Sequence, residues 1–216
     1  MKAIIIGATG LTGSLLLNKL ETTKKFKSIT ALVRKEIKSD TGIIYKKINF
    51  EDLPGLKIKA DAAFSCLGTT IKSAGSKENF RQVDFTYNLD FAGMCRKNGI
   101  ERFILLSALG ADPDSKIFYS RIKGELEKEI KAMGFKYLTI IRPSLLEGPR
   151  KEWRTGEFIA RKIMKIFNPL LMGNLKKYRS VSIDNITDIM LKESFRKEPG
   201  IIIIENDEII SRSSRH

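Results

Sequence analysis

Tyr119 and Lys123 stand four residues apart in the segment FYSRIKGELEKEI, which begins at Phe118. Residues at this spacing share one face of an α-helix, so both side chains can point into the same cleft. A free phenol has a pKa near 10, and an ammonium about 4 Å away at an effective dielectric constant of about 20 would favour its ionised form by roughly 4 kcal/mol. The pair is a candidate acid/base catalyst, although in a lysine-rich chain the same spacing also fits two solvated side chains.

The position of the pair favours the catalytic interpretation. The segment RFILLSALGA has the pattern of a short strand that ends at Ser107, and Tyr119 begins the next expected helix. Carboxyl ends of strands in an open parallel sheet border the ligand crevice, so Ser107, Tyr119 and Lys123 are expected to converge there. Without these neighbours, Ser107 would be interpreted as a turn or cap residue.

Three glycines separate the first expected strand from the first expected helix in the segment GATGLTGSLL. Such glycines give a tight turn, let the backbone approach a pyrophosphate and allow close packing of helix on strand. The helix N-terminus then offers unpaired N–H groups and the positive end of a dipole to phosphates. A turn that serves packing alone is the alternative. The expected cofactor contacts in this turn are Gly7, Thr9, Gly10, Leu11, Thr12 and Gly13.

Two basic residues, Arg34 and Lys35, follow the second expected strand in the segment ALVRKE. In dinucleotide-binding folds an acidic residue at this place accepts hydrogen bonds from the adenosine ribose, whereas a basic residue suits a 2′-phosphate. Arginine also matches phosphate oxygens bidentately. NADP(H) is therefore favoured over NAD(H), and Glu36 is the residue that would support NAD(H) instead.

The elements that must position these residues alternate along the chain. Short β-rich runs such as KAIIIGA, SITALVR, ADAAFSCLG and YLTIIRP are separated by helical segments, one of them spanning about 78–98. This alternation predicts an α/β fold of the Rossmann type, doubly wound, with a mainly parallel sheet and helices on both faces. Residues 1–216 are expected to form a single NAD(P)-binding domain.

Residues 145–180 are predicted to form a small, partly helical C-terminal segment on the substrate side, or a lid. The stretch FIARKIMKIFNPLL within it has apolar residues at helical spacing and a stop at Asn168-Pro169. A helix that packs on the domain is the favoured interpretation, and a membrane-surface helix or a dimer contact are the alternatives.

Composition excludes several classes of site. No apolar run reaches the roughly 20 residues needed for a membrane span. The two cysteines, Cys66 and Cys95, lack metal-ligand spacing, so neither a disulfide framework nor a zinc site is suggested. The single histidine, His216, removes most Ser-His-Asp chemistry and histidine-based metal sites. No metal is predicted, and because no secretory signal is visible, the cytoplasm is the expected location.

The formal net charge of +14 is compatible with an anionic partner. A nucleotide cofactor, nucleic acid or a membrane surface would each fit, as would a basic surface without a dedicated partner. No helix-turn-helix, zinc-finger or aromatic RNA-binding pattern is visible, so no sequence-specific nucleic-acid binding is predicted.

The segments GATGLTG, SCLGTT, LLSALGA, YSRIKGELE, IIRPSLLEGPR and SVSIDNITDIM together resemble the short-chain dehydrogenase/reductase superfamily. They are most similar to its small atypical branch related to Tat-interacting-protein oxidoreductases, and the resemblance spans nearly the whole chain. It implies that Tyr119 donates a proton, that Lys123 binds the nicotinamide ribose and favours the phenolate, and that Ser107 orients a carbonyl oxygen. The further cofactor contacts that it implies are Leu67, Gly68, Thr69, Pro143 and Ser144.

Two departures qualify the resemblance. Asp84 stands where many relatives have an asparagine, so the usual proton-relay role is open. The chain after Arg150 is short beside nucleotide-sugar epimerases, which favours a small substrate. We therefore expect an NADP(H)-dependent oxidoreductase that acts on a small carbonyl compound or alcohol, as a monomer or homodimer. An NADP(H)-binding regulatory or sensor protein that acts through a protein partner is the alternative, because fold alone does not establish catalysis.

Overall fold

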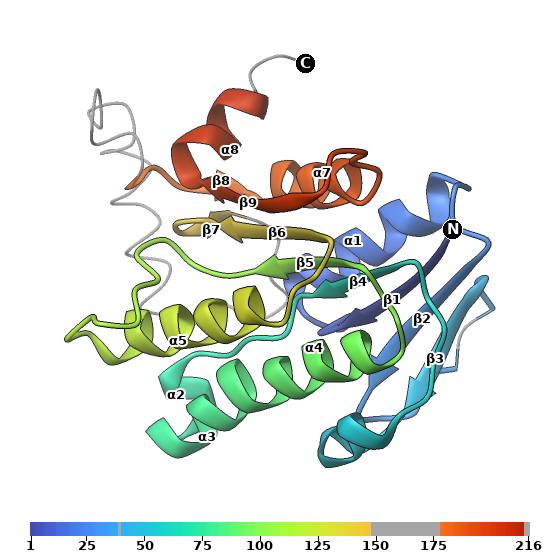
Figure 1. Cartoon of the computed structure of the whole chain (residues 1–216), viewed down its shortest axis with the longest axis horizontal. Helices are drawn as coiled ribbons and strands as arrows, with labels where there is room; N and C mark the ends of the chain where they lie inside the picture. The colour runs from blue at the N-terminus through green and yellow to red at the C-terminus, as the bar shows by residue number, and fades with distance from the viewer. Residues whose placement is uncertain (39, 148–177, 214–216) are drawn as a thin grey trace.

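The computed structural model describes residues 1–38, 40–147 and 178–213, and a seven-stranded sheet runs through its centre (Figure 1). The strand order is β3-β2-β1-β4-β5-β6-β9, and every neighbouring pair is parallel. The strands are β1 (Lys2–Ile6), β2 (Ser28–Val33), β3 (Ile43–Lys47), β4 (Ala62–Ser65), β5 (Arg102–Leu106), β6 (Tyr137–Arg142) and β9 (Gly200–Glu205). This order confirms the expected doubly wound fold.

The middle strands are apolar on both faces. Ala3 and Ile5 of β1 belong to one hydrophobic core, whereas Ile4 and Ile6 belong to the core on the other face. All four residues of β4 are buried. Such strands are typical of parallel sheets that are covered by helices on both sides.

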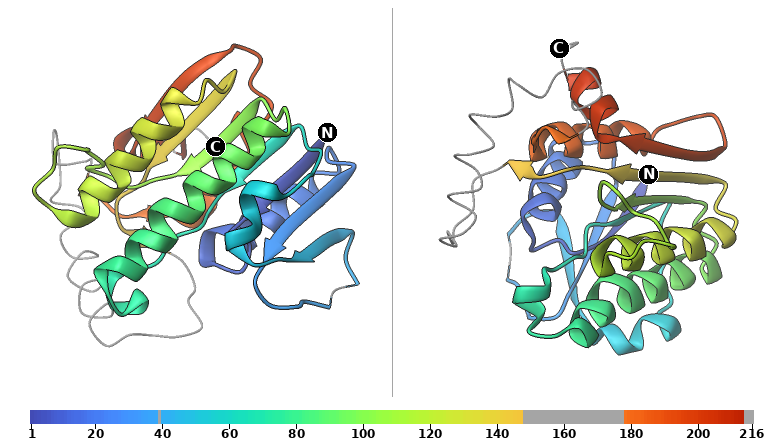
Figure 2. Two further views of the ribbon diagram at one scale, coloured as in Figure 1. Left: turned by 60° about the horizontal axis from the view of Figure 1, so that its bottom comes forward. Right: turned by 90° about the vertical axis from the view of Figure 1, so that its left-hand side faces the viewer.

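Helices cover both faces of this sheet (Figures 1 and 2). Those of one face, α1, α7 and α8, pack in one core, and α4, α5 and the 3-10 helix η1 pack in the other. The helices are α1 (Leu11–Thr22), η1 (Phe50–Gly55), α2 (Ile71–Ala74), α3 (Lys77–Arg81), α4 (Tyr87–Lys97), α5 (Phe118–Ala132), α7 (Ile183–Glu193) and α8 (Asn206–Ser213). In α5, Ile122, Leu126 and Ile130 are buried at a spacing of four, which directs one row of the helix to the core.

The helix expected over 78–98 is interrupted by a π-helical turn. Helix α3 passes into this turn, η2 (Gln82–Thr86), and the chain continues as α4. Asp84 lies in the turn and is 1% exposed. Because π-helical turns are rare and occur frequently at functional sites, this interruption makes Asp84 a candidate functional residue.

The segment predicted over 145–180 is described only at its two ends. Residues 148–177, which include the predicted amphipathic helix, lie outside the described residues. The two ends meet in a short parallel pair, β7 (Leu146–Glu147) with β8 (Val181–Ser182). In the described ranges, no helix has both the length and the apolar composition that crossing a membrane requires.

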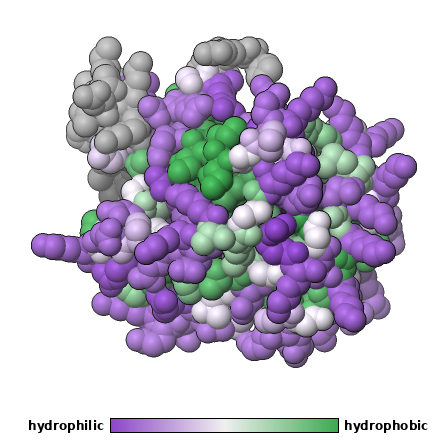
Figure 3. Space-filling model, viewed as in Figure 1, coloured by the Kyte–Doolittle hydropathy of each residue, from purple (hydrophilic) through white to green (hydrophobic). Residues whose placement is uncertain are grey.

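The surface seen in Figure 3 is largely hydrophilic, and its most extended dark-green apolar patch lies in the upper part of the view. The patch lies over β9, the end strand of the sheet, where Ile201 is 50% exposed. Exposure falls along this strand, from the exposed Ile201 through the half-buried Ile202 and Ile203 to the buried Ile204.

Candidate active site

A cleft of about 140 Å³ lies where β4, β5 and β6 end. Each of these strands is followed at once by residues that line the cleft, as expected for the carboxyl edge of a parallel sheet. The residues proposed from the sequence that line it are Leu67, Gly68, Thr69, Ser107, Tyr119, Lys123, Pro143 and Ser144. The structure therefore brings the three predicted catalytic side chains together with five further predicted cofactor contacts.

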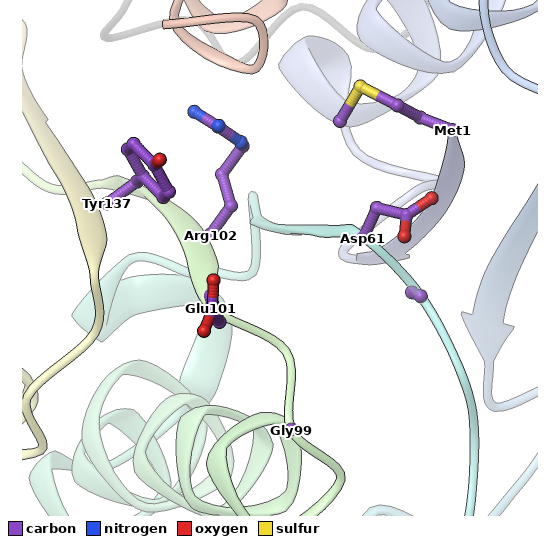
Figure 4. A pocket seen from close by; sticks show the side chains of 7 residues that line it. Met1, Asp61, Gly99, Glu101, Arg102 and Tyr137 are labelled. Carbon is purple, nitrogen blue, oxygen red and sulfur yellow. The ribbon is translucent and has the colours of Figure 1, made fainter. Parts of the chain in front are cut away.

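A second cavity, of about 260 Å³, lies at the opposite edge of the sheet (Figure 4). Met1, Asp61, Arg102 and Tyr137 line it, and each stands at or just before the start of a strand. The guanidinium of Arg102 lies 4.0 Å from the centre of the Tyr137 ring. Although this cavity is larger than the cleft, it contains none of the predicted catalytic residues, and ligands of such sheets bind at the other edge.

The glycine turn presses against the chain that leaves β4. Gly7 has φ +80, and a Cβ there would lie 2.4 Å from the carbonyl carbon of Cys66. A Cβ on Gly13 would lie 2.1 Å from the carbonyl oxygen of Gly7. The Gly10 N–H donates to that same oxygen at 3.0 Å, which closes the turn. Only glycine fits the two crowded positions, so the backbone of the turn is bare toward a ligand.

Helix α1 begins immediately after Gly10, and its first turn contains no acidic side chain. Thr9 and Gly10 are exposed, Leu11 is half-buried and Thr12 is buried. The unpaired N–H groups of the first turn thus meet solvent at the switch point between β1 and β4, without a carboxylate to repel an anion. This bare, positively polarised turn fits the pyrophosphate of a nicotinamide dinucleotide.

Arg34 and Lys35 follow β2 directly and are both exposed. The Arg34 guanidinium lies 5.9 Å from the centre of the Phe50 ring in η1. Their place beside the glycine turn, on the neighbouring strand, is where the adenosine ribose lies in dinucleotide folds. Glu36 is also exposed at this edge, one residue further from the strand.

Lys123 is buried, with 4% of its surface exposed, and its ammonium lies 2.7 Å from Oδ1 of Asp84. The other oxygen of Asp84 accepts a hydrogen bond from the Thr69 N–H at 2.8 Å. Burial by itself would lower the pKa of Lys123, but the charge of Asp84 and the neighbouring Tyr119 raise it, and the net pKa is above the ordinary value. Asp84, whose role the sequence left open, therefore pairs directly with the lysine and joins it to the loop after β4.

Asn88 holds the π-helical turn in place. Its side-chain amide donates to the carbonyl oxygen of Val83 at 2.9 Å and to that of Leu67 at 3.3 Å. Its side-chain oxygen accepts from the hydroxyl of Ser65 at the end of β4. The turn that carries Asp84 and the loop that borders the cleft are thus fixed by one side chain.

Tyr119 is half-buried in the first turn of α5. Its ring centre lies 5.6 Å from that of Phe80, a buried residue of α3. This contact supports one side of the ring, while the residue lines the cleft.

Ser107 donates its hydroxyl hydrogen to Oε1 of Glu127 at 2.6 Å. Glu127 is 1% exposed, and Arg142 donates to it twice, from Nε at 3.0 Å and from Nη2 at 2.6 Å. The bond to Glu127 raises the pKa of Arg142, so the arginine remains charged. Glu127 was not identified from the sequence, although it stands four residues after Lys123 and therefore on the same helix face as the Tyr119–Lys123 pair.

Pro143 and Ser144 follow β6 and are anchored by hydrogen bonds. The carbonyl oxygen of Pro143 accepts from the Leu109 N–H at 2.8 Å. The Ser144 N–H donates to the side-chain oxygen of Asn206 at 2.8 Å, and its hydroxyl donates to the carbonyl oxygen of Arg179. The far wall of the cleft is therefore tied to the start of α8.

Cys66 also lines the cleft. Burial raises the pKa of its thiol to about 12, so the thiol is protonated at neutral pH. A protonated thiol is a poor nucleophile, so Cys66 is not a candidate for nucleophilic catalysis.

Comparison with known proteins gives consistent matches. A family model described as NAD(P)H-binding matches residues 7–162. Protein FMP52, mitochondrial, of Candida albicans is 31% identical over 97% of this chain and 97% of its own. Protein HTATIP2 of Rattus norvegicus is 34% identical over 166 residues, which cover 73% of this chain and 68% of that protein.

Solved structures show the same fold at lower identity. MoeE5 in complex with UDP-glucose and NAD has a TM-score of 0.72 at 14% identity, and the match covers 100% of this chain and 81% of that one. The oxidoreductase ylbE from Lactococcus lactis has a TM-score of 0.61 at 22% identity, with 100% and 98% coverage. At these identities the likeness establishes the fold alone.

The expectation of a cytoplasmic protein is contradicted by the names of the relatives, because several fungal ones are designated mitochondrial. The expectation rested on the absence of a secretory signal and of a disulfide framework. Proteins of any reducing compartment can lack a secretory signal and a disulfide framework, so neither absence identifies the cytoplasm.

Proposed function

Because the chain belongs to the NAD(P)H-binding family, we propose that it is an NADP(H)-dependent oxidoreductase of the short-chain type. It interconverts a small carbonyl compound and the corresponding alcohol, with Tyr119 as the acid/base. The observation that carries this proposal is the convergence of Tyr119, Lys123 and Ser107 in one cleft beside the loop Leu67–Thr69.

The nicotinamide cofactor supplies the hydride chemistry when bound. Gly7, Gly10 and Gly13 present bare backbone to its pyrophosphate, and Arg34 with Lys35 provides positive charge for a 2′-phosphate. These groups bind and orient without taking part in bond changes.

Tyr119 protonates the substrate oxygen in the reductive direction and accepts the proton in the oxidative one. Lys123 stays charged in its buried position because Asp84 lies 2.7 Å away, and it contributes a fixed ammonium beside the tyrosine. The ring of Phe80 restrains the tyrosine from the side of α3.

The relatives named mitochondrial make a mitochondrial location part of the proposal. The nicotinamide cofactor of the proposal rests on the NAD(P)H-binding family model, because the structure of MoeE5 in complex with UDP-glucose and NAD is 14% identical to this chain and shares only its fold. A small substrate remains our proposal.

The test is NADPH consumption over a panel of small aldehydes, ketones and quinones by the protein and its Tyr119→Phe variant. The phenol oxygen is the only atom removed, so we expect a loss of turnover of roughly 10²-fold or more with an unchanged dissociation constant for NADPH. Tyr137→Phe is the matched control, because Tyr137 lies at the opposite edge of the sheet beside Arg102 (Figure 4).

Three outcomes separate the possibilities. Loss in Tyr119→Phe alone supports the proposal. Equal activity of both variants and the parent would remove Tyr119 from the mechanism. Tight NADPH binding with no turnover of any panel member would favour a cofactor-sensing protein instead.

A further inference from the structure

The hydroxyl of Ser107 has a single hydrogen, and that hydrogen is already donated. Its acceptor is Oε1 of Glu127 at 2.6 Å. A serine hydroxyl offers one donor and two acceptor positions, so what remains for a ligand is acceptor capacity only. A serine that orients a carbonyl oxygen must instead donate to it.

The direction of this bond depends on Glu127 being ionised. Arg142 donates to both of its oxygens, at 3.0 Å and 2.6 Å, and Lys131 donates to Oε2 at 3.4 Å. A carboxylate that is 1% exposed and receives charged donors on both oxygens has no proton of its own to give. It can only accept from Ser107.

Glu127 contacts Ser107 but does not itself line the cleft. It lies one helical turn beyond Lys123 on α5, buried behind the cleft that Ser107 and Lys123 line. The carboxylate therefore acts on a bound molecule only through the serine hydroxyl.

We propose that Glu127 is a positioning residue that turns Ser107 into a hydrogen-bond acceptor and thereby selects substrates with a donor beside the reacting carbon. The substrate class is hydroxy-carbonyl compounds and the corresponding diols, in preference to isolated ketones and aldehydes. A plain carbonyl would place its oxygen lone pairs against those of the serine, whereas a neighbouring hydroxyl donates to them.

This inference rests on the proposed oxidoreductase function and refines its substrate. The probe is a matched pair, hydroxyacetone and 2-butanone, in which a hydroxyl replaces a methyl group. We expect kcat/KM for hydroxyacetone to exceed that for 2-butanone by about tenfold or more, as for a site built to accept a substrate hydroxyl.

Glu127→Gln reverses the polarity without changing the size of the side chain. Because Arg142 Nη2 and Lys131 both donate at the Oε2 position, the amide oxygen takes that place and the amide N–H group faces Ser107, while Arg142 Nε loses the acceptor that it has in the parent protein. The serine then accepts from the glutamine and its own hydrogen is free to point into the cleft. The ratio of kcat/KM values should fall about tenfold or more, toward or below one.

Two further variants complete the experiment. Ser107→Ala removes the acceptor, so the ratio should approach one whatever the absolute rates become. Glu129→Gln changes an exposed glutamate of the same helix. Its ratio of kcat/KM values for the two ketones should equal that of the parent protein. Since each result is a ratio within one variant, a general loss of stability does not alter it, and Ser107→Ala decides the matter if Glu127→Gln does not fold.

Failure of the inference is distinct from failure of the proposed function. Equal kcat/KM values for the two ketones, or a hydroxyl preference retained in Glu127→Gln, would overturn the role of Glu127 while leaving a reductase. If neither ketone is consumed, their dissociation constants for the complex with NADP⁺, measured by ligand-observed NMR, replace the rates. Equal constants there would overturn the inference without any need for turnover.

Discussion

Lys123 keeps a positive charge inside the protein because a carboxylate lies beside it. The ion pair with Asp84 is almost fully buried on both sides, with 5% and 1% of the two side chains exposed. Removing one partner of such a pair is costly, since the other charge remains without compensation. The pair therefore ties the geometry of the cleft to the stability of the protein.

Asp84→Asn should lower the free energy of unfolding by about 3 kcal/mol at neutral pH, because the ammonium of Lys123 stays buried without its counter-charge. The pKa of Lys123 is raised in the parent protein, so this stabilisation is complete below about pH 10.4 and is lost as pH rises through the folded pKa. The gap between the two proteins should narrow above about pH 10 in urea titrations.

The control for this prediction is Asp184→Asn. Asp184 also pairs with a lysine, Lys19, at 2.9 Å, but its side chain is 60% exposed. An exposed pair contributes less than about 1 kcal/mol, so this variant should unfold nearly as the parent does. If both variants lose the same free energy of unfolding, burial of the ion pair is not the cause of the loss in Asp84→Asn.

The second residue-scale prediction tests cofactor choice. Replacing Arg34 and Lys35 together by serine should raise the dissociation constant for NADPH by about tenfold or more and change that for NADH little, because charge-assisted bonds to a 2′-phosphate are lost. The matched control is Lys46 and Lys47 changed to serine, two exposed lysines on β3. An equal effect on NADH and NADPH, or an equal effect in the control, would refute a role specific to the 2′-phosphate.

The sequence was sufficient to predict some of the residues that line the cleft, and insufficient for others. Tyr119 and Lys123 follow from a local spacing, and their convergence with Ser107 follows from the rule that parallel strands end at one edge. Glu127 resembles any other glutamate of a charged helix until Arg142 of β6 and Ser107 after β5 are placed around it. The role of such a residue depends on partners that are distant in sequence, and the periodicity of the sequence contains no information about those contacts.

At the scale of elements, the glycine turn leaves no room for side chains. The element-scale prediction is that Gly13→Ala lowers the free energy of unfolding by about 2 kcal/mol and weakens NADPH binding at least about tenfold, because its Cβ would lie 2.1 Å from the carbonyl oxygen of Gly7. Thermal unfolding and cofactor titration measure both effects.

Gly93→Ala is the control for this prediction. Gly93 lies within α4, and an added Cβ meets no atom within 4 Å. Alanine is favoured over glycine in a helix by about 1 kcal/mol, so this variant should be slightly more stable than the parent. A destabilised Gly93→Ala would show that loss of glycine, rather than crowding at the turn, causes the effect.

The elements themselves were predictable where an apolar run or helical spacing marks them in the sequence. The strands and the long helices agree with the apolar runs and helical spacing, because tertiary packing and local pattern select the same conformation there. Helix α8, the 3-10 helix η1 and the π-helical turn were not predicted. Each is short, and the turn depends on the Asn88 side chain bonding to Val83 and Leu67.

At the scale of the whole molecule, the two cores share their strands. Alternate residues of β1 enter opposite cores, so neither core can lose its packing while the other keeps the strand in place. The described part of the chain should therefore unfold as one cooperative unit.

The whole-molecule prediction is that α1 and α7 lose amide protection at the same denaturant concentration as α4 and α5. Native-state hydrogen exchange followed by mass spectrometry resolves these helices separately. Earlier exposure of the α1–α7 side would contradict the single domain that the sequence predicts.

The π-helical turn Gln82–Thr86 holds about one residue more than a turn of α-helix needs. Deletion of a single residue in this turn would convert it to regular α-helix. We therefore expect the protein to keep its fold after a one-residue deletion at this position. The same deletion would remove the wide turn that carries Asp84 and shift its carboxylate relative to Lys123, while the helices on either side keep their phase. Length variation at this position would therefore separate proteins that keep the fold from proteins that keep the charged lysine in its cleft.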